Sequence, residues 1–383
     1  MKIIFLCGSL EPGRDGVGDY VSRLSTELLR TGHQVMAIGL NDQYIKDLFL
    51  SDEIVVSLRV NIIRLPSIWT SNKRFHHAKY LIDEFNPDWL SLQFVPFAFH
   101  DKGLPFFLIN QLLFIGNKRK WHIMFHELWV GMNKESSFKK HLWGMVQRYL
   151  IKILITKLKP QVIHTQTILY KVQLERMHYK CHLLPLFSNI TNLSDNNYYL
   201  PPKIRDDHYI DLVVFGYIHP RAQIETLAKE ASLYAAQHLC TVRLIIVGRS
   251  GPELGHWRKK WQEVGLSVII MGEQSSESVS DILRSATLGI TTTPLALIGK
   301  SGTVAAMLEH RLLVLCLASP WTASGINNPL APTSVFPYEY GKFASYLGVN
   351  SSQSTYSTLS DVAQQFTDCL TTFNGVNQRS TQF

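Results

Sequence analysis

The sequence has few cysteines, and their placement excludes two common kinds of site. The five are Cys7, Cys181, Cys240, Cys316 and Cys369. They are odd in number and far apart, so they match neither a disulfide framework nor the usual spacing of metal ligands. This pattern is typical of a reducing compartment, and we expect a cytoplasmic protein.

Long apolar runs are also lacking. A membrane-spanning helix needs roughly 20 consecutive apolar residues. The longest candidate, residues 104–116, is interrupted by Asn110 and Gln111. The apolar segment at the N-terminus is too short for a secretory signal peptide and instead predicts a first β-strand. The sequence therefore predicts no transmembrane segment.

Acidic residues are scarce in one part of the chain. The net charge is +8, and between Lys102 and Lys159 eleven Lys or Arg residues stand against two acids, Glu127 and Glu135. Within this region, residues 139–159 mix basic and large apolar side chains. Such a helix could lie on the inner face of an anionic membrane. It could equally be a packed helix with solvated lysines, because apolar positions nearly encircle it.

The charge is not accompanied by any recognised nucleic-acid-binding motif, so no nucleic-acid partner is expected. What the chain does have is length. Its 383 residues exceed the size at which one hydrophobic core stops growing, so two domains are expected.

Strand-length apolar runs alternate with helical patterns through both halves of the chain. This alternation is typical of doubly wound α/β domains with parallel sheets. We expect a Rossmann-like N-terminal domain at residues 1–188, a polar linker at 189–208 and a second Rossmann-like domain at 209–335. Residues 336–383 predict C-terminal helices followed by a flexible tail from Asn374.

The most informative stretch is residues 287–317, which predict a strand, a loop, a helix and a second strand. The loop ends in Gly-Lys-Ser-Gly-Thr at residues 299–303, and the helix is expected from about Lys300. Free N–H groups at a helix start, small residues and a lysine together favour a phosphate site. Pro294 stands where an ATPase P-loop needs its first glycine, so that motif is not indicated. The alternative is an ordinary solvated helix start.

Two further features lie next to predicted strand ends. A glycine loop ending in Gly16-Val17-Gly18 follows the first predicted strand, and His126-Glu127 follows the predicted strand at residues 121–125. In doubly wound sheets the carboxyl ends of the strands carry the ligand-facing loops. The glycine spacing does not match the dinucleotide fingerprint. A lone histidine at a strand end is more often structural, so both interpretations of His126 stay open.

With these segments in view, the chain resembles the GT-B glycosyltransferases, particularly glycosyltransferase family 4, over nearly its whole length. The similarity is distributed over several segments. They are PGRDGVGDYVSRLSTELLRTGHQV, MFHELW, VVFGYIHPR, LIIVGRSGPEL followed by VIIMGE, and TTTPLALIGKSGTVAAMLEHRLLVL. The resemblance implies two Rossmann-like domains facing a cleft, with C-terminal helices that pack back on the N-terminal domain.

The resemblance also implies an activity. The protein would transfer a hexosyl group from a nucleotide sugar, UDP- or GDP-linked, to the hydroxyl of a glycan, lipid or small-molecule acceptor in carbohydrate biosynthesis. The acceptor would bind to the N-terminal domain, and the reaction would retain stereochemistry. The sequence contains no Asp-x-Asp pair, so we expect no metal and no cofactor. Cationic side chains and helix N-termini can stabilise the departing diphosphate instead.

The expected site residues follow from the matching segments. His126 is assigned a catalytic role and Glu127 an acceptor contact. Cations would face the diphosphate, and the residues after a donor-domain strand would border the base. The expected donor-binding residues are Gly16, Arg221, Arg249, Gly272, Glu273, Lys300, Ser301, Gly302 and Thr303.

Two departures from the family pattern keep other functions open. The position of the family's donor-domain lysine is occupied by Ala222, with Arg221 beside it. The family's pair of glutamates is replaced by Ile298 and Ala306. One alternative is therefore a nucleotide-sugar epimerase on the same fold. Another is a non-catalytic partner protein that binds a nucleotide or a sugar.

Overall fold

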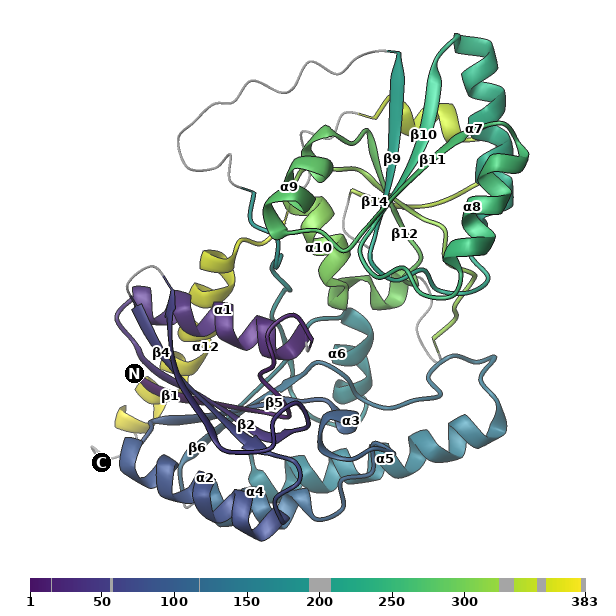
Figure 1. Ribbon diagram of the computed structural model, residues 1–383. Coiled ribbons are helices and arrows are strands. Elements are labelled where there is room, and N and C mark those ends of the chain that lie inside the picture. The colour runs from purple at the N-terminus through teal and green to yellow at the C-terminus, as the bar shows by residue number, and fades with distance from the viewer. Residues whose placement is uncertain are drawn as a thin grey trace. The chain divides into compact units, whose positions relative to one another are not determined.

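A computed structural model describes residues 1–14, 16–55, 58–116, 118–192, 208–323, 334–349 and 356–379. The chain forms two compact units. The first comprises Met1–Pro185, Ala323–Gly325 and Leu359–Phe383, and the second comprises Leu186–Thr322 and Ile326–Thr358. Each unit has one sheet with helices on both faces (Figure 1). Most of the predicted linker, residues 193–207, lies outside the described residues.

The first unit contains an eight-stranded sheet in the order β3-β4-β2-β1-β5-β6-β7-β8. Neighbouring strands are parallel except for the antiparallel edge pair β3–β4. The strands are β1 (Lys2–Cys7), β2 (Gln34–Asp42), β3 (Phe49–Val55), β4 (Leu58–Pro66), β5 (Trp89–Phe94), β6 (Lys120–Phe125), β7 (Val162–Thr165) and β8 (His182–Leu183). The strand order reverses between β1 and β5, and ligands of such sheets bind at the carboxyl ends beside this switch point.

Seven helices of the described chain belong to the first unit. They are α1 (Gly16–Arg30), α2 (Ser71–Phe85), α3 (Pro96–Phe99), α4 (Leu108–Gly116), α5 (Phe138–Leu158), α6 (Ile168–Glu175) and α12 (Leu359–Arg379). Helix α4 packs against both α2 and α5, and α12 packs beside α1 (Figure 1). Phe366 of α12 stacks on Phe5 of β1. The last helix therefore completes the core of the N-terminal domain, as the family resemblance implies.

The end of the chain differs from the prediction in two ways. Helix α12 continues to Arg379, past Asn374, where the sequence predicts a flexible tail. Extending a helix that is already formed adds one hydrogen bond per residue at little further cost, so Asn374 and the glycine after it do not stop the helix. Helix α11 (Phe343–Leu347) packs in the second unit through Phe343 and Tyr346. Helix α11 thus belongs to the second unit and α12 to the first.

The second unit contains a six-stranded parallel sheet in the order β11-β10-β9-β12-β13-β14. Its strands are β9 (Tyr209–Phe215), β10 (Thr241–Val247), β11 (Ser267–Gly272), β12 (Leu288–Thr291), β13 (Val314–Cys316) and β14 (Val335–Pro337). Its helices, besides α11, are α7 (Ile224–His238), α8 (Leu254–Glu263), α9 (Ser276–Ser285), the 3-10 helix η2 (Leu295–Lys300) and α10 (Gly302–Glu309). The strand order reverses between β9 and β12.

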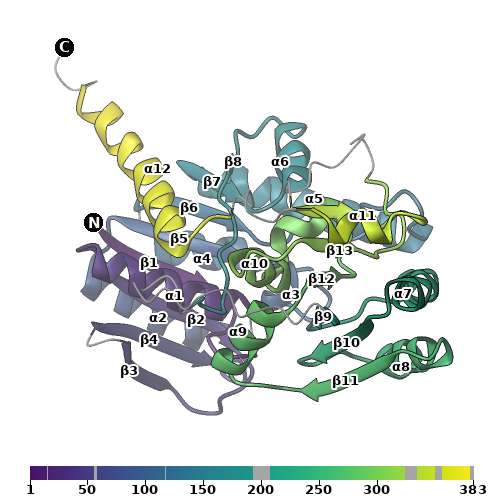
Figure 2. The same cartoon turned by 90° about the horizontal axis from the view of Figure 1, so that it is seen from above.

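Alternate residues of these strands pack on opposite faces of the sheet. Leu212 and Val214 of β9 join Trp257 of α8 in one apolar cluster. Val213, between them, joins Met307 of α10 in the other cluster. Figure 2 shows α7 and α8 on one side of these strands and α9 and α10 on the other. This double-sided packing confirms the predicted pair of doubly wound α/β domains.

Across the described residues, no helix is both long enough and apolar enough to cross a membrane.

Candidate functional site

Three glycines line the carboxyl edge of the sheet in the second unit. Gly216, Gly248 and Gly272 lie at the ends of the adjacent strands β9, β10 and β11, with φ of 84°, 86° and 65°. The N–H of Gly216 donates to the carbonyl of Val247 at 2.8 Å, and that of Gly248 donates to the carbonyl of Gly272 at 2.7 Å. Glycine adopts these conformations without strain. These three positions therefore carry no side chain, and a Cβ at Gly272 would meet only open space.

The switch point between β9 and β12 brings further polar groups to this edge. Thr292 follows β12, and its Oγ1 accepts from the N–H of His219 at 2.8 Å and donates to the carbonyl of Tyr217 at 3.4 Å. A Cβ at Gly216 would lie 2.8 Å from Cγ2 of Thr303, in the first turn of α10. The start of α10 therefore lies directly against the end of β9.

Lys300 ends the 3-10 helix η2, whereas the sequence predicts that it begins the next helix. Ser301 is the N-cap of α10, and its hydroxyl lies 3.1 Å from that of Thr303. Partial burial lowers the pKa of His219, and the positive charge of Lys300 lowers it further. Gly302 has open space where a Cβ would lie. The structure thus brings the predicted residues 300–303 to the glycine edge, together with His219.

Arg249 and Glu273 follow the neighbouring strands β10 and β11 and form an ion pair. Nε of Arg249 lies 3.0 Å from Oε2 of Glu273, and both side chains are more than half exposed, at 55% and 66%. An exposed pair of this kind contributes little to stability and exchanges partners readily. Arg249 is therefore at the glycine edge, where a ligand anion would compete with Glu273 for it.

Arg221 is positioned by its backbone. It is exposed, has a φ of 65°, and its carbonyl accepts a hydrogen bond from the hydroxyl of Ser319, beyond β13. Ala222, at the position of the family's lysine, packs against the apolar cluster beneath α7 and α8. Among the contacts of the described residues, none brings the Arg221 guanidinium to Lys300 or Gly216.

In the first unit, His126 lies directly after β6 and is 6% exposed. Its Nε2 donates to Oε1 of Gln93 at 2.8 Å, and its backbone N–H donates to the carbonyl of Phe94 at 3.1 Å. The ring packs edge-on against Tyr20 of α1, with centroids 5.2 Å apart. The partly buried Glu127 follows it. The structure therefore places the predicted pair at the carboxyl edge of the sheet.

A buried chain of hydrogen bonds continues from His126 into the sheet. Nε2 of Gln93 donates to Oγ of Ser91 at 2.8 Å, Ser91 lies 2.8 Å from Nδ1 of His122, and Nε2 of His122 lies 3.0 Å from Nδ1 of His164. Burial lowers the pKa of His122 well below its usual value and that of His164 to about 3. Both rings are therefore neutral at pH 7. Because an amide oxygen only accepts, Gln93 requires His126 to carry its proton on Nε2.

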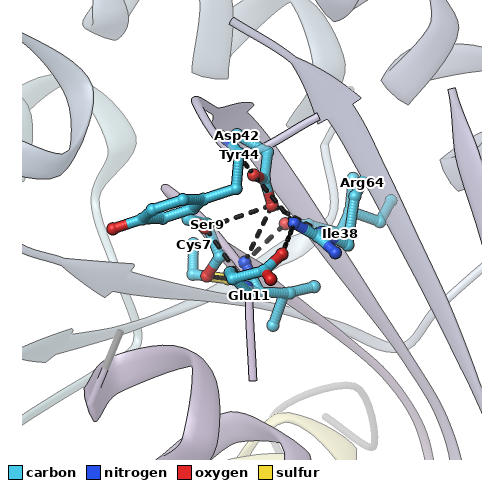
Figure 3. A network of polar contacts seen from close by, with 8 residues as sticks. Cys7, Ser9, Glu11, Ile38, Asp42, Tyr44 and Arg64 are labelled. Carbon is cyan, nitrogen blue, oxygen red and sulfur yellow. Dashed lines mark hydrogen bonds and ion pairs between the residues drawn. The ribbon is translucent and has the colours of Figure 1, made fainter. Parts of the chain in front are cut away.

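The glycine loop after β1 is fixed by a second polar network (Figure 3). The buried carboxylate of Asp42, at the end of β2, accepts from Nε of Arg64 at 2.7 Å, from the Ser9 hydroxyl at 3.1 Å and from the Leu10 N–H at 3.2 Å. Burial alone would raise the pKa of Asp42, but the Arg64 guanidinium and the backbone donors hold it below its usual value. Arg64 also pairs with Glu11. These contacts hold the backbone of the loop in place beside the ends of β1 and β2.

Gly16 begins α1 and is exposed, with open space where a Cβ would lie. The side chain of Asp19 accepts from the N–H of Gly13 at 2.9 Å and so ties the loop to the first turn of the helix. The structure thus places Gly16 at an accessible helix start in the first unit.

Several residues at these edges were not predicted from the sequence. Gly248 lies in a segment that resembles the family, and its position directly after a strand is the signal that could have identified it. His219 and Thr292 also lie in segments that resemble the family, but their hydrogen bond to each other joins residues far apart in the chain, and Gln93 carries no comparable signal. In the part of the chain that the structure describes, no group of three or more His, Cys, Asp or Glu side chains is arranged to hold a metal.

No family model and no curated protein matches the sequence. Solved structures do match. The apo lipopolysaccharide outer core galactosyltransferase WaaB is 14% identical, with 97% of this chain and 99% of that chain covered and a TM-score of 0.56. The catalytic domain of starch synthase IV from Arabidopsis thaliana, bound to ADP and acarbose, is 13% identical, with 97% and 99% covered and a TM-score of 0.58.

An epimerase matches equally well. The UDP-GlcNAc 2-epimerase from Neisseria meningitidis, bound to UDP-GlcNAc, is 10% identical, with 97% of this chain and 100% of that chain covered and a TM-score of 0.56. At these identities the likeness establishes the fold and not the activity. The two doubly wound units and these structural neighbours together show that the chain has the GT-B fold.

Proposed function

We propose that the protein is a glycosyltransferase that moves a sugar from a nucleotide-sugar donor to an acceptor hydroxyl. The observation that carries this proposal is the glycine edge of β9, β10 and β11 with Lys300 and the start of α10 beside it. A base can lie flat against a backbone that has no side chains. A diphosphate can accept hydrogen bonds from the first N–H groups of α10 and from Lys300.

The same geometry supports a donor that carries a diphosphate. Lys300 and the N-terminus of α10 supply positive charge, and Arg249 adds a second cation that a phosphate could take from Glu273. In the transfer, the bond between the sugar's anomeric carbon and the diphosphate breaks, the acceptor oxygen bonds to that carbon, and the acceptor's proton passes to the departing diphosphate. The fixed positive charge stabilises the departing diphosphate without a metal or cofactor. We propose hexosyl transfer from a UDP- or GDP-sugar with retained stereochemistry.

The first unit would hold the acceptor. Gln93 fixes the protonated Nε2 of His126, so Nδ1 is an acceptor in this tautomer. Such a nitrogen suits the proton of a sugar hydroxyl. We propose that His126 positions the reacting sugar and that Glu127 contacts the acceptor.

A nucleotide-sugar epimerase is the second candidate, because an epimerase matches the chain as well as the transferases do. The test is a thermal-shift screen of nucleotide sugars, followed by product analysis of the stabilising one with and without acceptors. Free nucleoside diphosphate and a glycosylated acceptor would support the transferase. An epimerised nucleotide sugar formed without acceptor would support the epimerase. Binding without turnover would support a non-catalytic partner protein.

We also propose a peripheral contact of the first unit with the cytoplasmic face of an anionic membrane. Helix α5 buries one apolar face and exposes another. The exposed apolar side chains Phe138, Leu142, Met145 and Tyr149 recur at spacings of four, three and four residues, and so form one stripe. Exposed basic residues accompany the stripe, and the helix contains no acid. An apolar stripe among cations fits an anionic lipid surface.

A further inference from the structure

A pocket of about 490 Å³ opens in the first unit beyond the carboxyl end of β2. Its walls come from the end of β2, the first turn of α2, and the chain from Phe99 to the second turn of α4. This volume is within the range of small-molecule sites. The hydrogen-bond chain of His126 and the Asp42 network contribute no lining residue, so the pocket is separate from both.

One wall of the pocket holds a partly buried arginine. Nη1 of Arg74 donates to the carbonyl of Leu40 at 2.8 Å and to Oδ1 of Asn41. Its Nε is buried and has no hydrogen-bond partner among the described residues. Both of its partners are neutral oxygens, and no ion pair of Arg74 is found in the described part of the chain.

Arg64, in the same unit, shows what a buried arginine normally has. It pairs with the carboxylates of Asp42 and Glu11. Although burial opposes its charge, these carboxylates raise the pKa of Arg64, whereas burial lowers the pKa of Arg74. A desolvated cation without a counter-charge is costly. Arg74 therefore lacks the anion that its position calls for.

Phenylalanine side chains form another part of the pocket wall, and a second hollow adjoins the pocket. Phe75 and Phe99 line it, and at its rim the side chains of Phe106 and Phe107 are 54% and 76% exposed. Phe106 also lines a groove of about 300 Å³ between α4 and α5, where Leu113, Tyr149 and Ile153 form the walls. The pocket that holds Arg74 and this largely apolar groove thus adjoin at Phe106 and Asn110, and the groove reaches Tyr149 of the exposed stripe and Lys157 of α5.

We propose that this pocket binds an anionic amphiphile as the acceptor, with a phosphate or carboxylate at Arg74 and an apolar chain running over Phe106 into the groove between α4 and α5. The identification of the ligand as the acceptor rests on the proposed function. Binding of the anionic amphiphile does not, because it depends on the pocket alone. A single ligand then satisfies the cation and covers the two exposed phenylalanines.

The test is calorimetric titration of the full chain with dodecyl phosphate below its micellar concentration, with inorganic phosphate, and with dodecyl maltoside as a neutral amphiphile. We expect one dodecyl phosphate per chain, bound at least about tenfold more tightly than either other probe, since one charge-assisted contact is worth that much. Arg74→Gln should lose this advantage, and Arg74→Lys should retain part of it. Lys79→Gln, which removes a cation of the same helix that is paired with Asp83, should change nothing.

Phe106→Ser should weaken the binding of dodecyl phosphate and leave the binding of inorganic phosphate unchanged. Equal binding of dodecyl phosphate by the wild type and a folded Arg74→Gln variant would overturn the site. Equal binding of inorganic phosphate and dodecyl phosphate would refute an amphiphilic ligand and indicate that the site binds a free anion. If Arg74→Gln does not fold, Arg74→Lys and Phe106→Ser decide the same question. Binding of nucleotide sugars is measured on the same samples. If the wild type binds none of them, the proposed function is refuted, whereas binding of the amphiphile at this site is not.

Discussion

Nε2 of His126 donates to Oε1 of Gln93 across 2.8 Å, from the end of one strand to the next. Gln93 is 1% exposed, and its amide nitrogen is bound in turn to Ser91. The amide therefore cannot rotate without breaking a second buried hydrogen bond. This arrangement holds the imidazole in one tautomer and one orientation, as a residue that positions a substrate requires.

For His126→Ala we expect turnover to fall by about 100-fold or more, with nearly unchanged affinity for the bare nucleoside diphosphate. In Gln93→Met, which keeps the imidazole but removes its hydrogen-bond acceptor, turnover should fall by about tenfold. Steady-state kinetics and calorimetry on the same preparations measure both effects. A purely structural histidine would instead lower the melting temperature and harm both quantities together. Normal turnover in a stable His126→Ala protein would refute the proposed role of His126 in positioning the sugar.

Lys300→Ala should weaken nucleoside-diphosphate binding by about 10- to 100-fold, the value of one charge-assisted contact. It should also raise the pKa of His219, because the positive charge of Lys300 lowers that pKa. An NMR titration of the histidines reports the second effect without any ligand. Lys342→Ala serves as control, since that lysine pairs with Glu339 elsewhere in the second unit. Unchanged affinity in the titration would remove Lys300 from the site.

The buried histidines should make the protein sensitive to acid. The folded state keeps His122 and His164 neutral, while in the unfolded chain each titrates near pH 6.5. Below that pH the unfolded state binds more protons, so the unfolding free energy falls as the pH drops from about 6.5 towards the folded-state values. Each histidine then contributes a loss of up to about 1.4 kcal/mol per pH unit.

His164→Gln removes one of these titrating groups. Urea unfolding between pH 7.5 and pH 5 should therefore show a smaller pH dependence in this variant than in the wild type, even if the variant is less stable at pH 7.5. His76→Gln, on the exposed side of α2, is the matched control and should leave the slope unchanged. Equal slopes for the wild type and His164→Gln would contradict the neutral, buried state of this ring.

Gly216→Ala tests the close approach at the glycine edge. The new Cβ would lie 2.8 Å from Thr303 on a backbone with a φ of 84°. We expect a loss of about 1–3 kcal/mol in unfolding free energy. Gly255→Ala is the control, because Gly255 lies in α8 with open space around it and should gain about 0.5–1 kcal/mol. A Gly216→Ala protein as stable as the wild type would show that the edge can move.

The membrane contact predicts liposome binding that needs anionic lipid and fades as salt rises, because the attraction is screened. A variant with Lys139→Glu and Lys152→Glu on α5 should lose most of this binding in co-sedimentation. Two matched reversals elsewhere in the first unit, Lys79→Glu and Lys171→Glu, should lose little. If the protein sediments equally with neutral and anionic vesicles, or with neither, the membrane contact is refuted and α5 is an ordinary solvated helix.

The fold could be predicted well from the sequence because the strands of both sheets are parallel, apart from the edge pair β3–β4, and the buried strands are strongly apolar. Errors fall where local sequence carries little information. The sequence predicts a strand at residues 54–58, whereas β3 ends at Val55 and β4 begins at Leu58. The apolar run covers the end of one strand and the start of the next, so its pattern does not show where either strand ends. Helix α3 has four residues, too few for a helical period to show.

The candidate site could be predicted where it consists of consecutive residues. Residues 300–303 form one such run, and the structure keeps them together at a strand edge. Gln93 looks like an ordinary strand residue and Arg74 like a solvated helix cation. The roles of both depend on residues 33 positions away in the chain, His126 for Gln93 and Asn41 for Arg74. For Arg221 the structure shows a left-handed backbone conformation and a carbonyl bonded to Ser319, and its predicted donor contact stays a prediction.

Helix α12 has a consequence for how the protein is made. Phe366 covers Phe5 of the first strand and packs edge-on against His122, with ring centroids 5.1 Å apart. The ribosome synthesises the other elements of the first unit before the second unit, and this helix after it. We therefore expect part of the sheet face of the first domain, including the buried polar chain, to stay uncovered until residues 359–379 leave the ribosome. The second domain needs nothing beyond residue 358 and can fold earlier, although it is encoded later.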